Sequence, residues 1–80
     1  MDIEVKLFSI LAQYLPPEAD GRRVCLTVSE GTTVAEILDQ LGIPRKLTKL
    51  IVIDGIIYQR SDRVLTDGNV LSLFPAIAGG

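Results

Sequence analysis

The stretch that decides the fold class is Thr33-Val34-Ala35-Glu36-Ile37-Leu38-Asp39-Gln40-Leu41-Gly42. Its first four residues form a capping box, in which the Thr33 hydroxyl and the Glu36 carboxylate each satisfy a backbone amide at the start of a helix. Apolar residues then recur at helical spacing until Gly42 and Pro44 end the pattern. These apolar residues are Val34, Ile37, Leu38 and Leu41. We therefore predict one main helix whose apolar stripe packs into a core.

The segments on both sides of this helix have the patterns of β-strands. Near the start of the chain, Ile3, Val5 and Leu7 alternate with polar residues, which is the period of a half-buried strand. Further strands are predicted over residues 22–28, 49–53, 56–58 and 70–74. Asp54-Gly55 is a hairpin turn signal between two of them.

A second, shorter helix is predicted over residues 9–15, with Ser9 as its N-cap and Pro16-Pro17 as its stop. The order of elements is then strand, short helix, strand, main helix, strand pair and final strand. This order predicts an α+β chain in which one principal helix covers one face of a sheet.

The composition limits how such a chain can be stabilised. It has 80 residues, no His and a single Cys, Cys25, so an intrachain disulfide and an ordinary structural zinc site are excluded. Because Cys25 lies in the apolar run 24–28, we expect it to be a small core or sheet residue.

Charge and hydropathy exclude other classes of protein. Eight basic and ten acidic residues are interleaved and give a net charge of −2, which argues against a nucleic-acid partner. No apolar run approaches the roughly 20 residues of a membrane span, and Met1-Asp2-Ile3-Glu4 does not resemble a signal peptide. We expect a soluble, cytoplasmic protein with no membrane partner.

Catalytic groups are scarce. Without His, no Ser-His or Cys-His nucleophile pair can be assembled. Asp62 and Asp67 could do acid-base chemistry, but both lie among turn residues, where Asp usually makes local hydrogen bonds. No phosphate-binding loop motif is present. A self-contained enzyme is not expected, nor is a metal or cofactor bound by this chain.

The chain ends in Ala78-Gly79-Gly80. Glycine has no Cβ, so such a tail can thread a narrow cleft, and the carboxylate of Gly80 is then its only reactive group. The alternative is a frayed or truncated end, because chain termini are often disordered. We expect a folded domain over residues 1–75 and a flexible Gly-Gly tail over residues 76–80.

Together these residues resemble a known family. The run from Leu65 to Gly80, with Phe74-Pro75 before the terminal Gly79-Gly80, is similar to the end of the small subunit of molybdopterin synthase. The resemblance implies a ubiquitin-like β-grasp fold, with a mixed sheet of four to five strands covered by one main helix plus one short helix. Two departures are visible: Asn69-Val70 stands where the family usually has Asp-Glu, and Ala76 where it commonly has a second Pro.

The resemblance also implies a function. In the family the counterpart of Gly80 is adenylated by a ubiquitin-activating-type partner, which uses ATP and Mg²⁺. Sulfur from a persulfide protein then converts it to a thiocarboxylate. The large subunit of molybdopterin synthase receives the tail, and sulfur passes to the pterin precursor. Gly79 gives the tail access to that active site.

The resemblance also suggests which residues bind the partner. In a β-grasp sheet the first and last strands are parallel neighbours, so Phe8 and Phe74 would lie together on the face opposite the core. An exposed aromatic pair there would suit a docking surface. The alternative is that the short helix or a loop covers both rings. The expected partner-binding residues are Phe8, Phe74, Pro75, Ile77 and Ala78.

Three other functions stay open at this point. One is the related sulfur carrier of thiamine synthesis, which shares the fold and the Gly-Gly end. Another is a ubiquitin-like modifier, in which the activated Gly80 is joined to a lysine of a target protein. The third is a plain interaction module whose Gly-Gly end has no chemical role.

Overall fold

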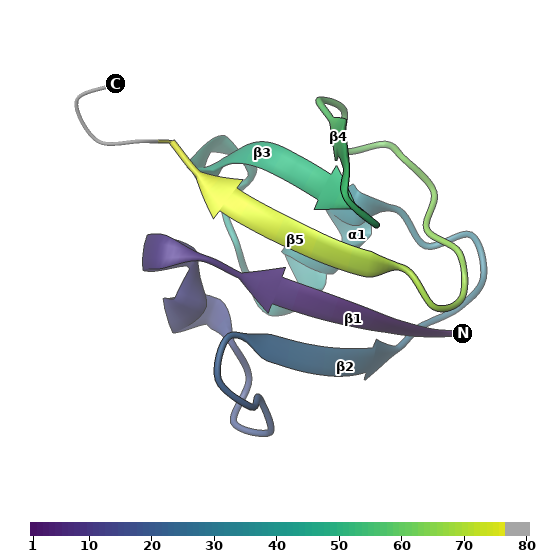
Figure 1. The fold of residues 1–80 in the computed structure, drawn as a ribbon, viewed down its shortest axis with the longest axis horizontal. Coiled ribbons are helices and arrows are strands. Elements are labelled where there is room, and N and C mark those ends of the chain that lie inside the picture. The colour runs from purple at the N-terminus through teal and green to yellow at the C-terminus, as the bar shows by residue number, and fades with distance from the viewer. Residues whose placement is uncertain (77–80) are drawn as a thin grey trace.

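The computed structural model describes residues 1–76. The elements follow the chain in the order β1 (Asp2–Leu7), the 3-10 helix η1 (Ser9–Tyr14), β2 (Arg23–Thr27), α1 (Val34–Leu41), the 3-10 helix η2 (Arg45–Leu47), β3 (Thr48–Ile53), β4 (Ile56–Tyr58) and β5 (Val70–Pro75). The strands form one sheet in the order β2-β1-β5-β3-β4, and α1 covers one of its faces (Figure 1). The predicted α+β class is confirmed.

Helix α1 begins and ends as its sequence predicts. Both halves of the capping box are present: the Thr33 N–H donates to Glu36 Oε1 at 3.0 Å, and the Glu36 N–H donates to Thr33 Oγ1 at 3.3 Å. At the other end Gly42 has a φ of 78°, a left-handed conformation that glycine adopts without steric cost. The helix therefore has defined bounds that do not depend on the sheet.

The sheet is mixed, with β5 at its centre. β5 is parallel to β1, with Leu7 opposite Leu73, and antiparallel to β3. β3 and β4 are joined by a two-residue hairpin in which Asp54 and Gly55 have φ angles of 51° and 85°. Two consecutive positive φ angles define the type I′ turn that the Asp-Gly pair predicts.

The core lies between α1 and the face of the sheet that it covers. Inward-facing residues of the strands, such as Val5, Leu71 and Leu73, are completely buried against Val34 and Ile37 of the helix. No polar residue is buried among residues 1–76. The opposite face of the sheet, which we call the open face, carries no helix (Figure 1).

Ser9 is not the N-cap of the short helix, contrary to the prediction. The cap position is Phe8, which makes no side-chain cap, and Ser9 itself has a φ of 55°. The Phe8 N–H donates to the Leu73 carbonyl at 3.2 Å, so Phe8 remains attached to the sheet. The chain turns sharply only after it, and the resulting helix is a short 3-10 helix rather than an α-helix.

Cys25 is exposed, so the prediction that it could be a core residue is wrong, although it does lie in the sheet. Val24 and Leu26 on either side of it face the core, which turns Cys25 to the open face. β2 is an edge strand, so nothing packs on Cys25 from its outer side.

Candidate partner-docking site at the tail end of the sheet

Phe8 and Phe74 form a stacked aromatic pair. Their ring centroids are 4.3 Å apart and the rings are inclined by 12°. Both residues are half-buried. Aromatic pairs of this kind contribute about 0.5–1.5 kcal/mol beyond the area they bury. The predicted meeting of these two residues is confirmed.

The register of β1 and β5 explains the pair. Leu7 and Leu73 are opposite one another and fully buried, so the next residue of each strand points to the open face. η1 starts directly after Phe8, but it directs Leu11 into the core and leaves the rings partly accessible. The pair is therefore partly covered: neither ring is among the exposed large hydrophobic residues, so the expected exposure holds only in part.

The aromatic pair continues into further apolar residues that the sequence reasoning missed. Leu50 of β3 is opposite Phe74, while Val52 is opposite both Ser72 of β5 and Ile57 of β4. Ile57 is 61% exposed. We call Phe8, Leu50, Val52, Ile57 and Phe74 the open-face patch. The run Leu50-Ile51-Val52-Ile53 could have indicated these residues, because consecutive apolar residues in a strand place apolar groups on both faces of the sheet.

The aromatic pair of the open-face patch lies at the base of the tail, whereas Val52 and Ile57 lie toward the β3–β4 hairpin. β5 extends through Pro75, which is opposite Thr48 at the start of β3, and Ala76 is exposed. β1 and β5 both finish at this end of the sheet (Figure 1), which we call the tail end. The predicted tail residues Ile77, Ala78, Gly79 and Gly80 lie outside the described residues.

Basic side chains surround the same end of the sheet. Lys6 and Arg23 are directly opposite one another on β1 and β2, and both face outward. The Arg22 guanidinium lies 5.7 Å from the centroid of the Phe8 ring, within the range of a cation–π contact. Glu4 is 3.7 Å from the Lys6 ammonium. The aromatic pair is therefore flanked by cations.

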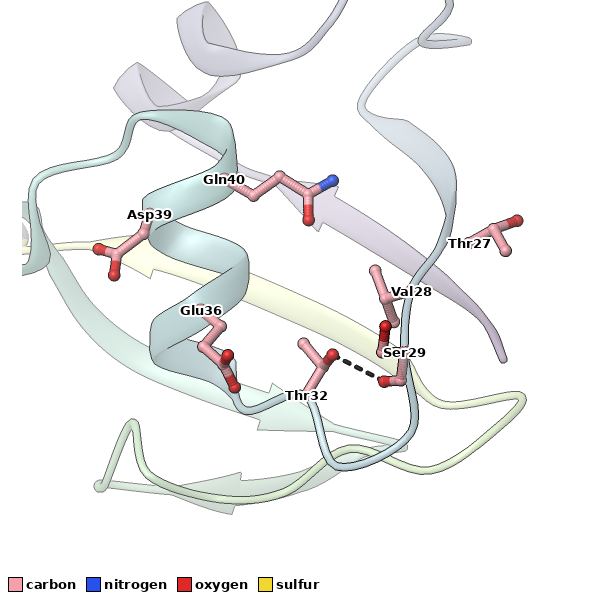
Figure 2. A pocket seen from close by; sticks show the side chains of 7 residues that line it. All are labelled: Thr27, Val28, Ser29, Thr32, Glu36, Asp39 and Gln40. Carbon is pink, nitrogen blue, oxygen red and sulfur yellow. Dashed lines mark hydrogen bonds between the residues drawn. The ribbon is translucent and has the colours of Figure 1, made fainter.

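An open polar cavity of about 810 Å³ lies elsewhere, between α1 and the chain that follows β2 (Figure 2). It is lined by Thr27, Val28, Ser29, Thr32, Glu36, Asp39 and Gln40. Several of its polar groups already have internal partners: Thr32 Oγ1 donates to the Ser29 carbonyl at 2.7 Å, and Glu36 closes the capping box. Asp39 binds Arg45 at 2.9 Å. This cavity supports the start of the helix and offers no unpaired reactive group.

Within residues 1–76, no group of three or more Cys, Asp or Glu side chains is arranged to hold a metal ion. None of the helices in this part of the chain is long and apolar enough to cross a membrane.

A model of the ThiS family matches residues 6–80, which is nearly the whole chain. This chain belongs to the ThiS family. Membership makes it a sulfur carrier of the ThiS/MoaD type, as the resemblance in sequence predicted. No curated protein matches the chain.

Solved structures agree with the ThiS-family fold. SAMP1 from Haloferax volcanii is 24% identical over 100% of both chains, with a TM-score of 0.71. A putative molybdopterin converting factor subunit 1 from Pyrococcus furiosus is 19% identical, with 95% of this chain and 98% of that chain covered and a TM-score of 0.67. In a complex of subunits 1 and 2 of the molybdopterin-converting factor from Helicobacter pylori, the match is 19% identical over 100% of both chains, with a TM-score of 0.62. At these identities the likeness shows the fold, and the predicted ubiquitin-like β-grasp architecture is confirmed.

Proposed function

We propose that this ThiS-family chain carries sulfur for molybdopterin synthesis as a thiocarboxylate on Gly80. The observation that supports this best is the stacked Phe8–Phe74 pair, which sits beside Pro75 at the base of the Gly-Gly tail. The chain has no His, and residues 1–76 hold no cluster of three or more Cys, Asp or Glu side chains arranged to hold a metal ion, which fits chemistry that is supplied by partners.

The proposed reaction follows from the poor reactivity of a carboxylate. Its leaving group would be oxide, so a ubiquitin-activating-type partner first joins the Gly80 carboxylate to AMP, using ATP and Mg²⁺ and releasing pyrophosphate. A persulfide sulfur from a donor protein then attacks the acyl carbon and AMP leaves. Cleavage of the S–S bond by a second thiol frees the thiocarboxylate. This chain contributes the tail and the surface that docks it.

The proposed recipient of the tail is the large subunit of molybdopterin synthase. The sequence Phe74-Pro75 before Gly79-Gly80 supports this choice, as does the likeness to a subunit 1 that was solved together with subunit 2. Phe8, Phe74 and Pro75 would bind the surface of the large subunit, while Ile77 and Ala78 would line the way into its active site. Aromatic residues at the centre of an interface often dominate the binding energy.

Mass spectrometry of the protein from its native cell tests the proposal. A C-terminal mass increased by the exchange of one oxygen for one sulfur is expected. Peptides from other proteins with Gly-Gly joined to lysine would instead indicate a modifier. If neither product is found, the chain is a plain interaction module.

Purified components provide the second test. Deletion of Gly80 should abolish sulfur transfer to the pterin precursor in the presence of the large subunit, with an unchanged circular dichroism spectrum. Full transfer by the deleted chain would contradict the mechanism. Transfer to a thiamine precursor alone would assign the chain to that pathway.

A further inference from the structure

The basic residues of this chain gather at one end of the sheet, although its net charge is −2. Lys6 is the last but one residue of β1, Arg22 precedes β2, and Arg23 begins it. Lys46 lies in η2 just before β3, and Lys49 is the second residue of β3. Thr48 is opposite Pro75, so β3 begins where the tail leaves. We call Lys6, Arg22, Arg23, Lys46 and Lys49 the basic rim.

The basic rim adds little to the stability of the fold: Arg22 makes one cation–π contact with Phe8, and Lys6 makes one exposed ion pair. Lys6 and Arg23 are directly opposite in an antiparallel pair, an arrangement of like charges that is destabilising. Among residues 1–76, the only ion pair of the rim joins Lys6 to Glu4, at the long distance of 3.7 Å. Asp20 meets Arg23 through backbone hydrogen bonds of 2.8 and 3.2 Å. The charges of the rim are thus left available to a partner.

Carboxylates occupy the opposite end of the sheet, which we call the far end. Asp2 starts β1, Asp54 lies in the hairpin between β3 and β4, and Asp67 lies in the turn before β5. Each of these three carboxylates accepts a hydrogen bond from the chain itself. Asp20 lies beside Arg23 at the tail end, but the five basic residues of the rim outweigh it there, so the far end is the more negative of the two.

We propose that the basic rim binds acidic side chains around the opening through which a partner protein receives the tail. This rests on the proposed function, in which the tail enters a partner's active site. The open-face patch supplies apolar contact but little orientation, whereas the charge difference between the two ends turns the tail end toward an acidic surface during approach. Complementary charges of this kind raise association rates more than they raise affinity.

Charge reversal in the rim tests this inference. R22E/R23E is compared with R60E/R63E, which changes the net charge equally but lies outside the rim. Arg60 is exposed and pairs with Asp62, and Arg63 lies over the ring of Tyr58. Stopped-flow fluorescence measures the association rate constant of each chain with the purified large subunit from the same cell, over a series of salt concentrations.

We expect R22E/R23E to lower the association rate constant by about tenfold or more at low ionic strength, with the difference disappearing at high salt because ions screen exposed charges. R60E/R63E should slow association less than R22E/R23E does, because Arg60 and Arg63 lie beside Ile57, at the end of the open-face patch that is remote from Arg22 and Arg23. Thermal unfolding of all variants checks their folding. If R22E/R23E is unfolded, R22Q/R23Q replaces it.

Equal slowing by both double variants would overturn the inference, and so would a wild-type rate constant that does not depend on salt. Binding of a fluorescein-labelled single-stranded RNA through Arg22 and Arg23, tighter than binding of the large subunit, would also overturn it. Absence of any wild-type binding to the large subunit would instead contradict the proposed function. Charge reversal of acidic residues at the mouth of the partner's active site should restore the rate constant of R22E/R23E.

Discussion

Strands β1 and β5 run through both ends of the sheet, but the polar side chains around them differ. At one end they stabilise the fold, and at the other end they face outward. At the far end, Asp54 accepts hydrogen bonds from the Asn69 side chain at 2.7 Å and the Val70 N–H at 2.8 Å. Asp67 accepts one from the Asp2 N–H at 2.7 Å. Polar groups there hold the turn that leads into β5.

At the tail end, the polar groups instead point outward. Lys6 and Arg23 oppose one another, and Arg22 lies over the Phe8 ring that stacks on Phe74. The difference teaches where each kind of change should be felt. Substitutions at the far end should lower stability and spare binding. Substitutions of the basic rim should weaken binding and spare stability, whereas loss of the stacked Phe8–Phe74 pair should lower both.

The largest expected effect comes from removing the aromatic pair. Phe8→Ala with Phe74→Ala should weaken binding to the large subunit by about 100-fold, the loss of about 3 kcal/mol that paired interface aromatics can supply. Isothermal titration calorimetry measures this loss. Ile56→Ala removes an apolar side chain that is 58% exposed and lies opposite the buried Ile53, on the other face of the sheet from the patch, and is the matched control. If the double variant binds the large subunit with unchanged affinity, the open-face patch is not part of the interface.

At the far end, Asp54→Ala should lower the free energy of unfolding by about 1–2 kcal/mol, because two hydrogen bonds are lost and alanine disfavours a positive φ. Asp54→Asn should lose less, since asparagine tolerates that backbone conformation. Urea unfolding provides the measurement. Affinity for the large subunit should stay within about twofold, because surface changes outside an interface have little effect. A large loss of affinity in either Asp54 variant would show that the far end also takes part in binding, which would contradict the proposed difference between the two ends.

A smaller effect of opposite sign is expected at the tail end. Arg23→Thr removes the like charge opposite Lys6 and should raise the free energy of unfolding by about 0.2–1 kcal/mol. The same variant should bind the large subunit more slowly at low salt. If urea unfolding gives a lower free energy of unfolding for Arg23→Thr than for the unchanged chain, Arg23 stabilises the sheet and is not kept for binding a partner.

The smallest effect is expected at Cys25. Because this side chain is exposed on an edge strand, Cys25→Ser should change the free energy of unfolding by less than about 0.5 kcal/mol, the usual range for surface substitutions. Thermal unfolding under reducing conditions measures it. A loss of several times that size would indicate that Cys25 is packed in the folded protein after all.

Features set by local chemistry could be predicted from the sequence. The bounds of α1 follow from a capping box at Thr33 and a left-handed Gly42, and the β3–β4 turn follows from Asp54-Gly55. The meeting of Phe8 with Phe74 could also be predicted, because alternation fixes which face each ring occupies once the two strands are neighbours.

Features set by the whole sheet could not be predicted in the same way. Ser9 turns where it does because Leu73, far along the chain, holds the Phe8 N–H. Cys25 is exposed because alternation turns it to the open face and because β2 is an edge strand, and only the second of these reasons depends on the rest of the sheet. Leu50 and Val52 join the site because of their register with β5, although the unbroken apolar run around them was visible.

The central position of β5 ties presentation of the tail to completion of folding. Asp2 and Asp67 are hydrogen-bonded although 65 positions separate them, and β5 leaves the ribosome after the other four strands of the described sheet. Pairings so distant in the chain form late, because the entropy of closing a long loop must be overcome first. The stacked Phe8–Phe74 pair is therefore absent from a nascent or misfolded chain, in which β5 has not yet paired with β1. A partner that requires this pair would activate only correctly folded molecules, and docking would act as a quality check before ATP is used.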